Sequence, residues 1–330
     1  MRSGFLAAAG AALCLSTQAL ADDSSAAMGM GGVVLTQSAN IRMAKEDLYV
    51  SPAQVRIRFE FVNDSAKDID TIVAFPLPDI DVGEYTESAM GTITEDPVNF
   101  VGFRTVSNGV PVAARVEQHA FHNGHDVTAV LASAGVPLNV VNNAAFKILE
   151  ALPAAKKQAL IKAGILEVDG DNIHPDWTVR TRFYWTQHFP AGKTVILTHS
   201  YQPVTGGFFF PVKADETDKD AIRNYCVDAG GMAAARRLKA EGTKANSEIA
   251  QSGYLNASNT DYILMSGNNW KGPIGHFHLT LDKLKPANIL STCWTGTLTK
   301  TGATTFEATE ENFSPKADIK LLVLTDMPAQ

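Results

Sequence analysis

Side chains in this 330-residue chain repeatedly alternate between polar and apolar, and this period of two is the strongest constraint on its fold. The pattern is clearest over residues 54–62, QVRIRFEFV, where every odd-numbered residue is apolar and all but the last even-numbered one are polar. Successive side chains of a β-strand point to opposite faces of its sheet, so such a segment buries one face. The sequence therefore predicts a mainly β protein.

Other segments carry the same signal or are rich in β-branched and aromatic residues. The dipeptide Asn108-Gly109 between two of them is the strongest short signal for a hairpin. Because most strands follow one another without a helix between them, we expect antiparallel β-sandwich units, as one domain or as two packed ones. The further expected strands are residues 69–75, 100–106, 110–116, 177–189, 194–201, 262–265, 274–281, 289–294, 304–308 and 319–324.

Two helical segments interrupt the strands, which makes the fold class α+β. Over residues 126–164 the spacing predicts three short helices, with Asp126 and Asn143 capping the first two. A second helical excursion is expected over residues 218–241, broken at Gly230-Gly231. The expected parts are an N-terminal β-sandwich (22–125), a helical insert (126–176) and a C-terminal β-rich part (177–330).

The first 21 residues have the pattern of a secretory signal peptide. Arg2 supplies a positive charge, residues 5–15 are apolar, and small residues precede a cleavage site after Ala21. Lipidation at Cys14 is disfavoured because Leu13 precedes it where small residues are needed. No later window reaches the ~20 apolar residues of a membrane span, so we expect a soluble periplasmic protein.

The charge of the chain argues against a nucleic-acid partner. The formal net charge is −7. The densest basic cluster, Arg236, Arg237 and Lys239, falls on a predicted helix, where a solvated surface is the ordinary explanation. We therefore expect an envelope protein or a small ligand as the partner.

Two cysteines remain once the signal peptide is removed, Cys226 and Cys293. An even pair in an oxidising compartment is expected to form one disulfide, which would close a loop of roughly 70 residues and stabilise the fold by ~4 kcal/mol. The alternative is a reactive or metal-bound pair, although neither cysteine has a CxxC partner or a histidine close in sequence.

The densest set of metal-ligand residues is His119, His122, His125 and Asp126. Imidazole and carboxylate groups suit zinc or copper, so a divalent metal is possible here, but no cofactor is predicted overall. The competing interpretation is a group of solvent-facing loop histidines, since Gly124 marks a strand-to-loop transition. Surface or turn roles are favoured for His276 and His278, for Asp79, Asp81 and Glu84, and for Asp169, Asp171 and Asp176.

Aromatic residues give a possible interaction surface. An exposed aromatic patch would mark a protein or ligand contact, whereas packing between sheets is the ordinary alternative. We expect the segment Gly206-Gly207-Phe208-Phe209-Phe210 to form a turn. The candidates are Trp177, Trp185, Phe208, Phe209 and Trp270.

The segments together resemble a bacterial secreted family catalogued as domain of unknown function 4424. The likeness is carried by DDSSAAMGMGGVVL, ANIRMAKEDLYVSP, VNDSAKDIDTIVAFPLPDID, DPVNFVGF, DVTAVLASAGVPLN, WTVRTRFYWTQHFPAGKTVILTHSYQPV and NNWKGPIGHFHLTLDK. The resemblance implies a periplasmic protein, a cysteine at each of the positions of Cys226 and Cys293, and no established activity. No catalytic or binding residues therefore carry over.

The N-terminal part also resembles, more remotely, the β-sandwich module of vault and inter-alpha-trypsin proteins, which implies a fold and not a function. No nucleophile elbow, HExxH helix, phosphate-binding loop or dinucleotide fingerprint is present in the sequence. Our leading hypothesis is a non-catalytic periplasmic binding or interaction module. The alternatives are an envelope hydrolase or metal-dependent enzyme whose site assembles only on folding, and a metal-handling protein.

Overall fold

A computed structural model describes residues 24–29, 32–87, 94, 96–213, 218–243 and 253–326. The expected signal peptide lies outside these residues. The chain is mainly β, as expected, and most of its strands pair antiparallel. In the described part of the chain, no helix is long and apolar enough to span a membrane.

One large sheet contains seven strands from the described residues. The sheet contains strands from before and after the helical insert. Strand β13, which follows the insert, lies between β9 and β5, which precede it. The order is β10 (His125–Asp126), β9 (Arg115–His122), β13 (Thr178–Phe189), β5 (Ile69–Pro76), β1 (Ser24–Gly29) and β2 (Gly32–Leu35), with β6 (Ile80–Asp81) also paired to β13.

The second large sheet contains eight strands, and near its centre a strand from the N-terminal part of the chain lies beside one from the C-terminal part. Here β17 pairs with β3 in parallel, although nearly all other pairs are antiparallel. The order is β19 (Thr299–Lys300), β20 (Thr305–Phe313), β17 (Ile274–Asp282), β3 (Ile41–Val50), β4 (Val55–Asn63), β14 (Thr194–Tyr201), β7 (Arg104–Ser107) and β8 (Val110–Val112).

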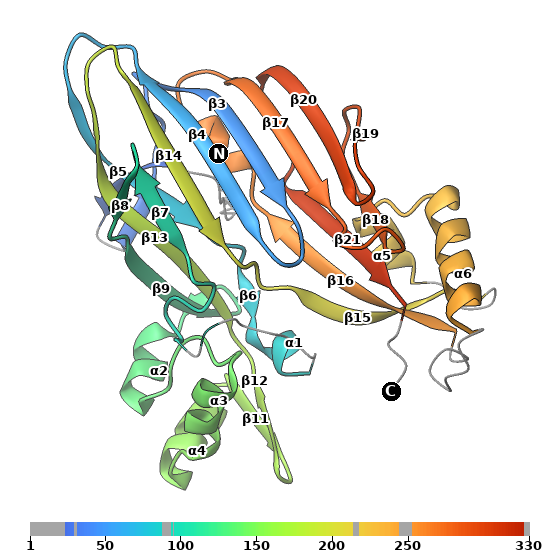
Figure 1. The fold of residues 1–330 in the computed structure, drawn as a ribbon. Coiled ribbons are helices and arrows are strands. Elements are labelled where there is room, and N and C mark those ends of the chain that lie inside the picture. Colours follow the sequence, from blue (N-terminus) through green and yellow to red (C-terminus); the bar gives the residue numbers. More distant parts are fainter. Residues whose placement is uncertain are drawn as a thin grey trace, which may run out of the picture.

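The two large sheets pack face to face around an aromatic core (Figure 1). The alternating apolar residues of β4 point inward, and the ring of Phe61 lies 6.0 Å from that of Phe189 on the opposite sheet. Trp270 lies 4.5 Å from Phe61 between ring centroids and is 3% exposed. Burial of aromatic rings of this size is a major source of stability, which explains why the period-two pattern determines the fold.

A third sheet extends from the sandwich and carries a separate small core under two helices. Its strands are β15 (Gly206–Pro211), β16 (Tyr254–Tyr262), β21 (Ile319–Thr325) and β18 (Ile289–Thr292), and the helices are α5 (Lys219–Asn224) and α6 (Ala229–Thr243). A disulfide joins Cys226, just after α5, to Cys293, just after β18, with an S–S distance of 2.09 Å. The predicted disulfide is therefore confirmed.

The helical insert has the three predicted helices, α2 (Thr128–Ala134), α3 (Asn143–Glu150) and α4 (Ala154–Lys162). They are followed by the hairpin of β11 (Leu166–Asp169) and β12 (Asn172–Pro175), and together they extend from one end of the sandwich (Figure 1). Asp126 accepts a hydrogen bond from the Thr128 N–H, but it lies in β10 and the residue that caps α2 is Val127, so the predicted Asp126 cap is wrong. The cap of α3 is Asn142, one residue before the predicted one, and its Oδ1 accepts from Ala145 N at 2.7 Å.

Several local predictions differ from the structure. Gly206–Pro211 is an edge strand and not a turn, because Phe208 packs against the small core below α5 and α6. Met265–Asn269 is a 3₁₀ helix where a strand end was expected. Gly230-Gly231 falls in the first turn of α6, and the helical break lies before it, between α5 and α6. The strand β3 was not predicted. The remaining short helix is α1 (Val82–Glu87).

The sheets also bear on the expected three-part division. Strands from before and after the helical insert share both large sheets, and β17 and β20 from the C-terminal part complete the eight-stranded one. The boundaries at residues 125 and 177 thus mark the ends of the insert, whereas the sandwich itself is built from residues on both sides. The division into these three parts stays a prediction.

Candidate functional site

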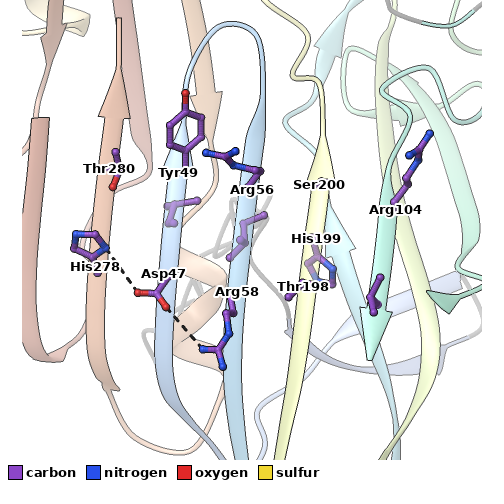
Figure 2. A pocket seen from close by; sticks show the side chains of 13 residues that line it. Asp47, Tyr49, Arg56, Arg58, Arg104, Thr198, His199, Ser200, His278 and Thr280 are labelled. Atoms are coloured by element: carbon purple, nitrogen blue, oxygen red, sulfur yellow. Dashed lines mark ion pairs between the residues drawn. The ribbon is translucent and has the colours of Figure 1, made fainter. Parts of the chain in front are cut away.

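A depression of about 500 Å³ lies on the outer face of the eight-stranded sheet, the face turned away from the other large sheet. Its lining side chains come from β17, β3, β4, β14 and β7 (Figure 2). Alternation along each strand places polar residues on this face while their neighbours enter the core. Because five adjacent strands supply the lining, the positions of these groups are fixed by backbone pairing and not by loops.

The first cross-strand row of the site combines two arginines with hydroxyl groups. In register across the strands, Thr280 lies opposite Tyr49, Tyr49 opposite Arg56, Arg56 opposite Ser200, and Ser200 opposite Arg104. Neighbouring strands lie about 4.8 Å apart, so the backbones of the two arginines are separated by roughly 10 Å, with Ser200 midway between them.

The second row, two residues along each strand, holds its charges in internal ion pairs. Asp47 Oδ2 lies 3.1 Å from Lys45 Nζ and 3.9 Å from Arg58 Nη1, and its Oδ1 lies 3.7 Å from His278 Nδ1. Arg58 also pairs with Glu60. Figure 2 shows Asp47 between His278 and Arg58, and the pairs with Lys45 and Glu60 complete the neutralisation of this row.

The arginines of the first row have a different environment. The guanidinium carbon of Arg56 lies 4.1 Å from the centre of the Tyr49 ring, and the Tyr49 hydroxyl donates to Asp282 Oδ2 at 2.8 Å. Burial and this hydrogen bond to Asp282 raise the pKa of Tyr49, so the phenol stays neutral. In the part of the chain that the structure describes, neither Arg56 nor Arg104 forms an ion pair with a carboxylate.

The predicted histidine cluster does not converge. His119 and His122 are an odd number of residues apart on β9, so their rings point to opposite faces of the sheet. His119 Nδ1 lies 3.1 Å from Asp126 Oδ2, whereas His122 Nδ1 is hydrogen-bonded to the backbone oxygen of Asp176 at 2.8 Å. His125 is exposed on β10.

Across the described residues, no three His, Cys, Asp or Glu side chains form a group that could hold a metal. The metal interpretation of the histidine cluster stays a prediction. Members of the other acidic and histidine sets have local partners. Asp79 forms an ion pair with Arg180, His276 forms one with Glu311, and Asp81 accepts a hydrogen bond from the backbone N–H of Gly83.

The predicted aromatic surface is corrected for its three tryptophans. Trp177, Trp185 and Trp270 are buried in the sandwich core, where they fill space between elements, and cannot form an exposed patch. Phe208 packs against the core below α5 and α6. Phe209 is 67% exposed on the edge strand β15 and remains as the single exposed residue of the predicted set.

The comparisons with known proteins give a family but no activity. A family model described as "Domain of unknown function (DUF4424)" matches residues 21–322. The chain belongs to the DUF4424 family. The expected family membership is therefore confirmed. No curated protein matches this DUF4424 chain. The remote likeness to the vault module stays a prediction.

Two solved structures are similar to this DUF4424 protein at low identity. One is the crystal structure of a Legionella pneumophila protein (lpg2210) provisionally named as nutrient binding, with 14% identity, a TM-score of 0.46, and coverage of 92% of this chain and 70% of that one. The other is an M1 zinc metallopeptidase from Deinococcus radiodurans, with 9% identity, a TM-score of 0.19, and coverage of 88% and 43%. Scores this low carry no argument about function.

Apart from His278, the residues of the depression were not among the candidates predicted from the sequence. Arg56 and Arg58 lie in the strand with the clearest alternation, where they served as evidence for a solvated face. The outer face of β4 carries two arginines and one glutamate. The role of these arginines depends on Arg104 and Ser200. No local sequence pattern predicts that β4 pairs with β14 and that β14 pairs with β7.

Proposed function

We propose that this DUF4424 protein is a non-catalytic binding module of the cell envelope and that the depression on the eight-stranded sheet is its ligand-binding surface. The observation that carries the proposal is a hollow of about 500 Å³ whose lining includes polar side chains from five paired strands. Binding sites are typically concave with a few fixed polar groups, and positions on strands are held more precisely than positions on loops.

The arrangement of the polar groups favours binding over catalysis. Asp47 and His278, the titratable pair nearest the centre, are held by Lys45 and Arg58 and by each other. Ser200 has a histidine as its chain neighbour, but His199 points into the core among the rings of Phe59, Phe75, Phe103 and Trp185. The hydroxyl and the imidazole lie on opposite faces of the sheet, so they do not form a nucleophile and base pair.

Export is the second component of the proposal. The disulfide Cys226–Cys293 fits an oxidising compartment, and the signal-like first 21 residues fit cleavage after Ala21. Fractionation of cells and N-terminal sequencing test this component. We expect periplasmic material that begins at Asp22, and full-length cytoplasmic protein would contradict it.

A steric substitution tests the binding surface without assuming the nature of the ligand. Thr198 lies in the second row of the depression, and Thr198→Trp would fill the space beside Ser200. The matched control is Thr186→Trp, at an exposed position on the outer face of the other large sheet. Both variants and the parent are purified from periplasm, and bound molecules are identified by native mass spectrometry.

We expect the parent protein and Thr186→Trp to retain a bound molecule or partner that Thr198→Trp loses. Melting temperatures of the three proteins confirm that the variants are folded. Equal retention by both tryptophan variants would show that the ligand binds elsewhere and would overturn the assignment of this surface.

A further inference from the structure

The first row of the depression contains two side chains that are only hydrogen-bond donors, Arg56 and Arg104. An arginine side chain carries five N–H donors and no acceptor, and Ser200 adds a hydroxyl between the two arginines. Neither guanidinium has a hydrogen-bond acceptor in the part of the chain that the structure describes. A surface of this composition is complementary to a group that supplies only acceptors, which in biological molecules is an oxyanion.

The charge around the site points in the same direction. The lining includes three arginines and a single carboxylate, that of Asp47. Asp47 is already shared among Lys45, Arg58 and His278, so its negative charge is neutralised locally. Among the lining residues, cationic side chains therefore outnumber carboxylates although the formal net charge of the chain is −7, and this local excess of positive charge favours anions over cations.

Arg56 is also preorganised for such a ligand. The Tyr49 ring is fixed by its hydrogen bond to Asp282, and the guanidinium of Arg56 lies over that ring. Contact with an aromatic face occupies the flat surface of the guanidinium and leaves its N–H edges free to donate. An arginine restrained in this way loses less side-chain entropy when it binds a ligand.

We propose that the depression binds the oxyanion of a small molecule, a carboxylate or a phosphate, seated over Ser200 between Arg56 and Arg104. This inference rests on the proposed function and adds the chemical class of the ligand. Arg56 contacts the oxyanion from one side in a fixed orientation, and Arg104, exposed on β7, contacts it from the other side. Tyr49 acts as a positioning residue through Arg56.

Calorimetric titration of the whole mature protein in low-salt buffer tests the inference. The probes are inorganic phosphate and succinate, which separate the two sources of the oxyanion, and glucose is the neutral control. We expect heat of binding for phosphate, succinate or both, and none for glucose. Added salt should weaken the binding, because charged groups at an open site are screened.

Substitutions identify the groups that bind the anion. Arg56→Gln and Arg104→Gln should each weaken the binding by roughly 10- to 100-fold, the usual effect of losing a charge-assisted contact. Arg236→Gln, at an exposed position on α6, removes the same charge far from the depression and should leave the affinity unchanged. Tyr49→Leu should weaken binding less than Arg56→Gln, while Arg56 retains its charge.

The failure of this inference can be separated from failure of the proposed function. If Thr198→Trp loses the native ligand but neither anion binds and both glutamine variants keep that ligand, the surface stands and its oxyanion chemistry is wrong. If phosphate or succinate binds equally well to the parent, both glutamine variants and Thr198→Trp, the anion binds elsewhere and the inference is also wrong.

Discussion

Asp261 shows how one buried group can make stability depend on pH. It lies on β16 opposite Lys320, and its Oδ1 is buried with no hydrogen-bond donor in the described part of the chain. Burial raises the pKa of Asp261 above its ordinary value of 3.8, nearby Asp318 adds to the rise, and Lys320 offsets part of it. The folded protein therefore holds this proton to a higher pH than the unfolded chain does.

This difference predicts the behaviour of Asp261→Asn. The stability that the protonated carboxyl contributes is fully present below pH ~4 and is lost as the pH rises through the folded pKa. The amide does not titrate, so the variant should gain stability relative to the parent as the pH rises from 4 to 7. Thermal unfolding across that range measures the gain, and a difference that does not change with pH would contradict the prediction.

At the scale of elements, the disulfide ties the helical layer to the third sheet. Cys226 and Cys293 are 67 residues apart in sequence, and a cross-link over a loop of this length stabilises by about 4 kcal/mol on the chain-entropy model. Cys226→Ser combined with Cys293→Ser should therefore lower the free energy of unfolding by up to that amount. Urea unfolding measures the loss. A reductant should destabilise the parent but leave the double variant unchanged, and equal effects on both would show that the bridge is not the cause.

Some local sequence patterns were sufficient to predict a turn or a strand. Asn108 and Gly109 have positive φ angles of 48° and 84°, as a tight hairpin needs, and the alternation of residues 54–62 gave β4 almost to the residue. Strand β3 was missed because a bulge after Met43 shifts its register. Its buried residues change from odd to even numbers at that point, so no single alternation runs through it.

The candidate site was less predictable than the elements that carry it. Tyr49 lies on the missed strand, and Arg56, Ser200 and Arg104 come from three strands that only the sheet order brings together. The face of each side chain follows from the local period, but the identity of its neighbours is decided by long-range pairing. Sequence reasoning could therefore find the solvent-facing arginines and could not assemble them into a site.

At the scale of the whole molecule, the parallel pairing of β3 with β17 joins the chain ends into one sheet. A fragment of residues 22–213 would lack β17 and β20, so β3, which is central in the complete sheet, would become an uncovered edge strand. Unpaired N–H and C=O groups along such an edge favour aggregation. We expect the fragment to be unfolded or aggregated, whereas residues 22–330 should be monodisperse. Circular dichroism and size-exclusion chromatography compare the two. A folded, monomeric fragment would instead support an independent N-terminal unit.

The same pairing has a consequence for the order of events during folding. Lys45 of β3 lies beside His276 of β17, so a strand made near the start of synthesis must wait for one made near its end. Contacts between such distant residues require a large loop to close, which makes folding slow. The eight-stranded sheet therefore cannot be completed until β17 and β20, which come late in the sequence, are available to pair.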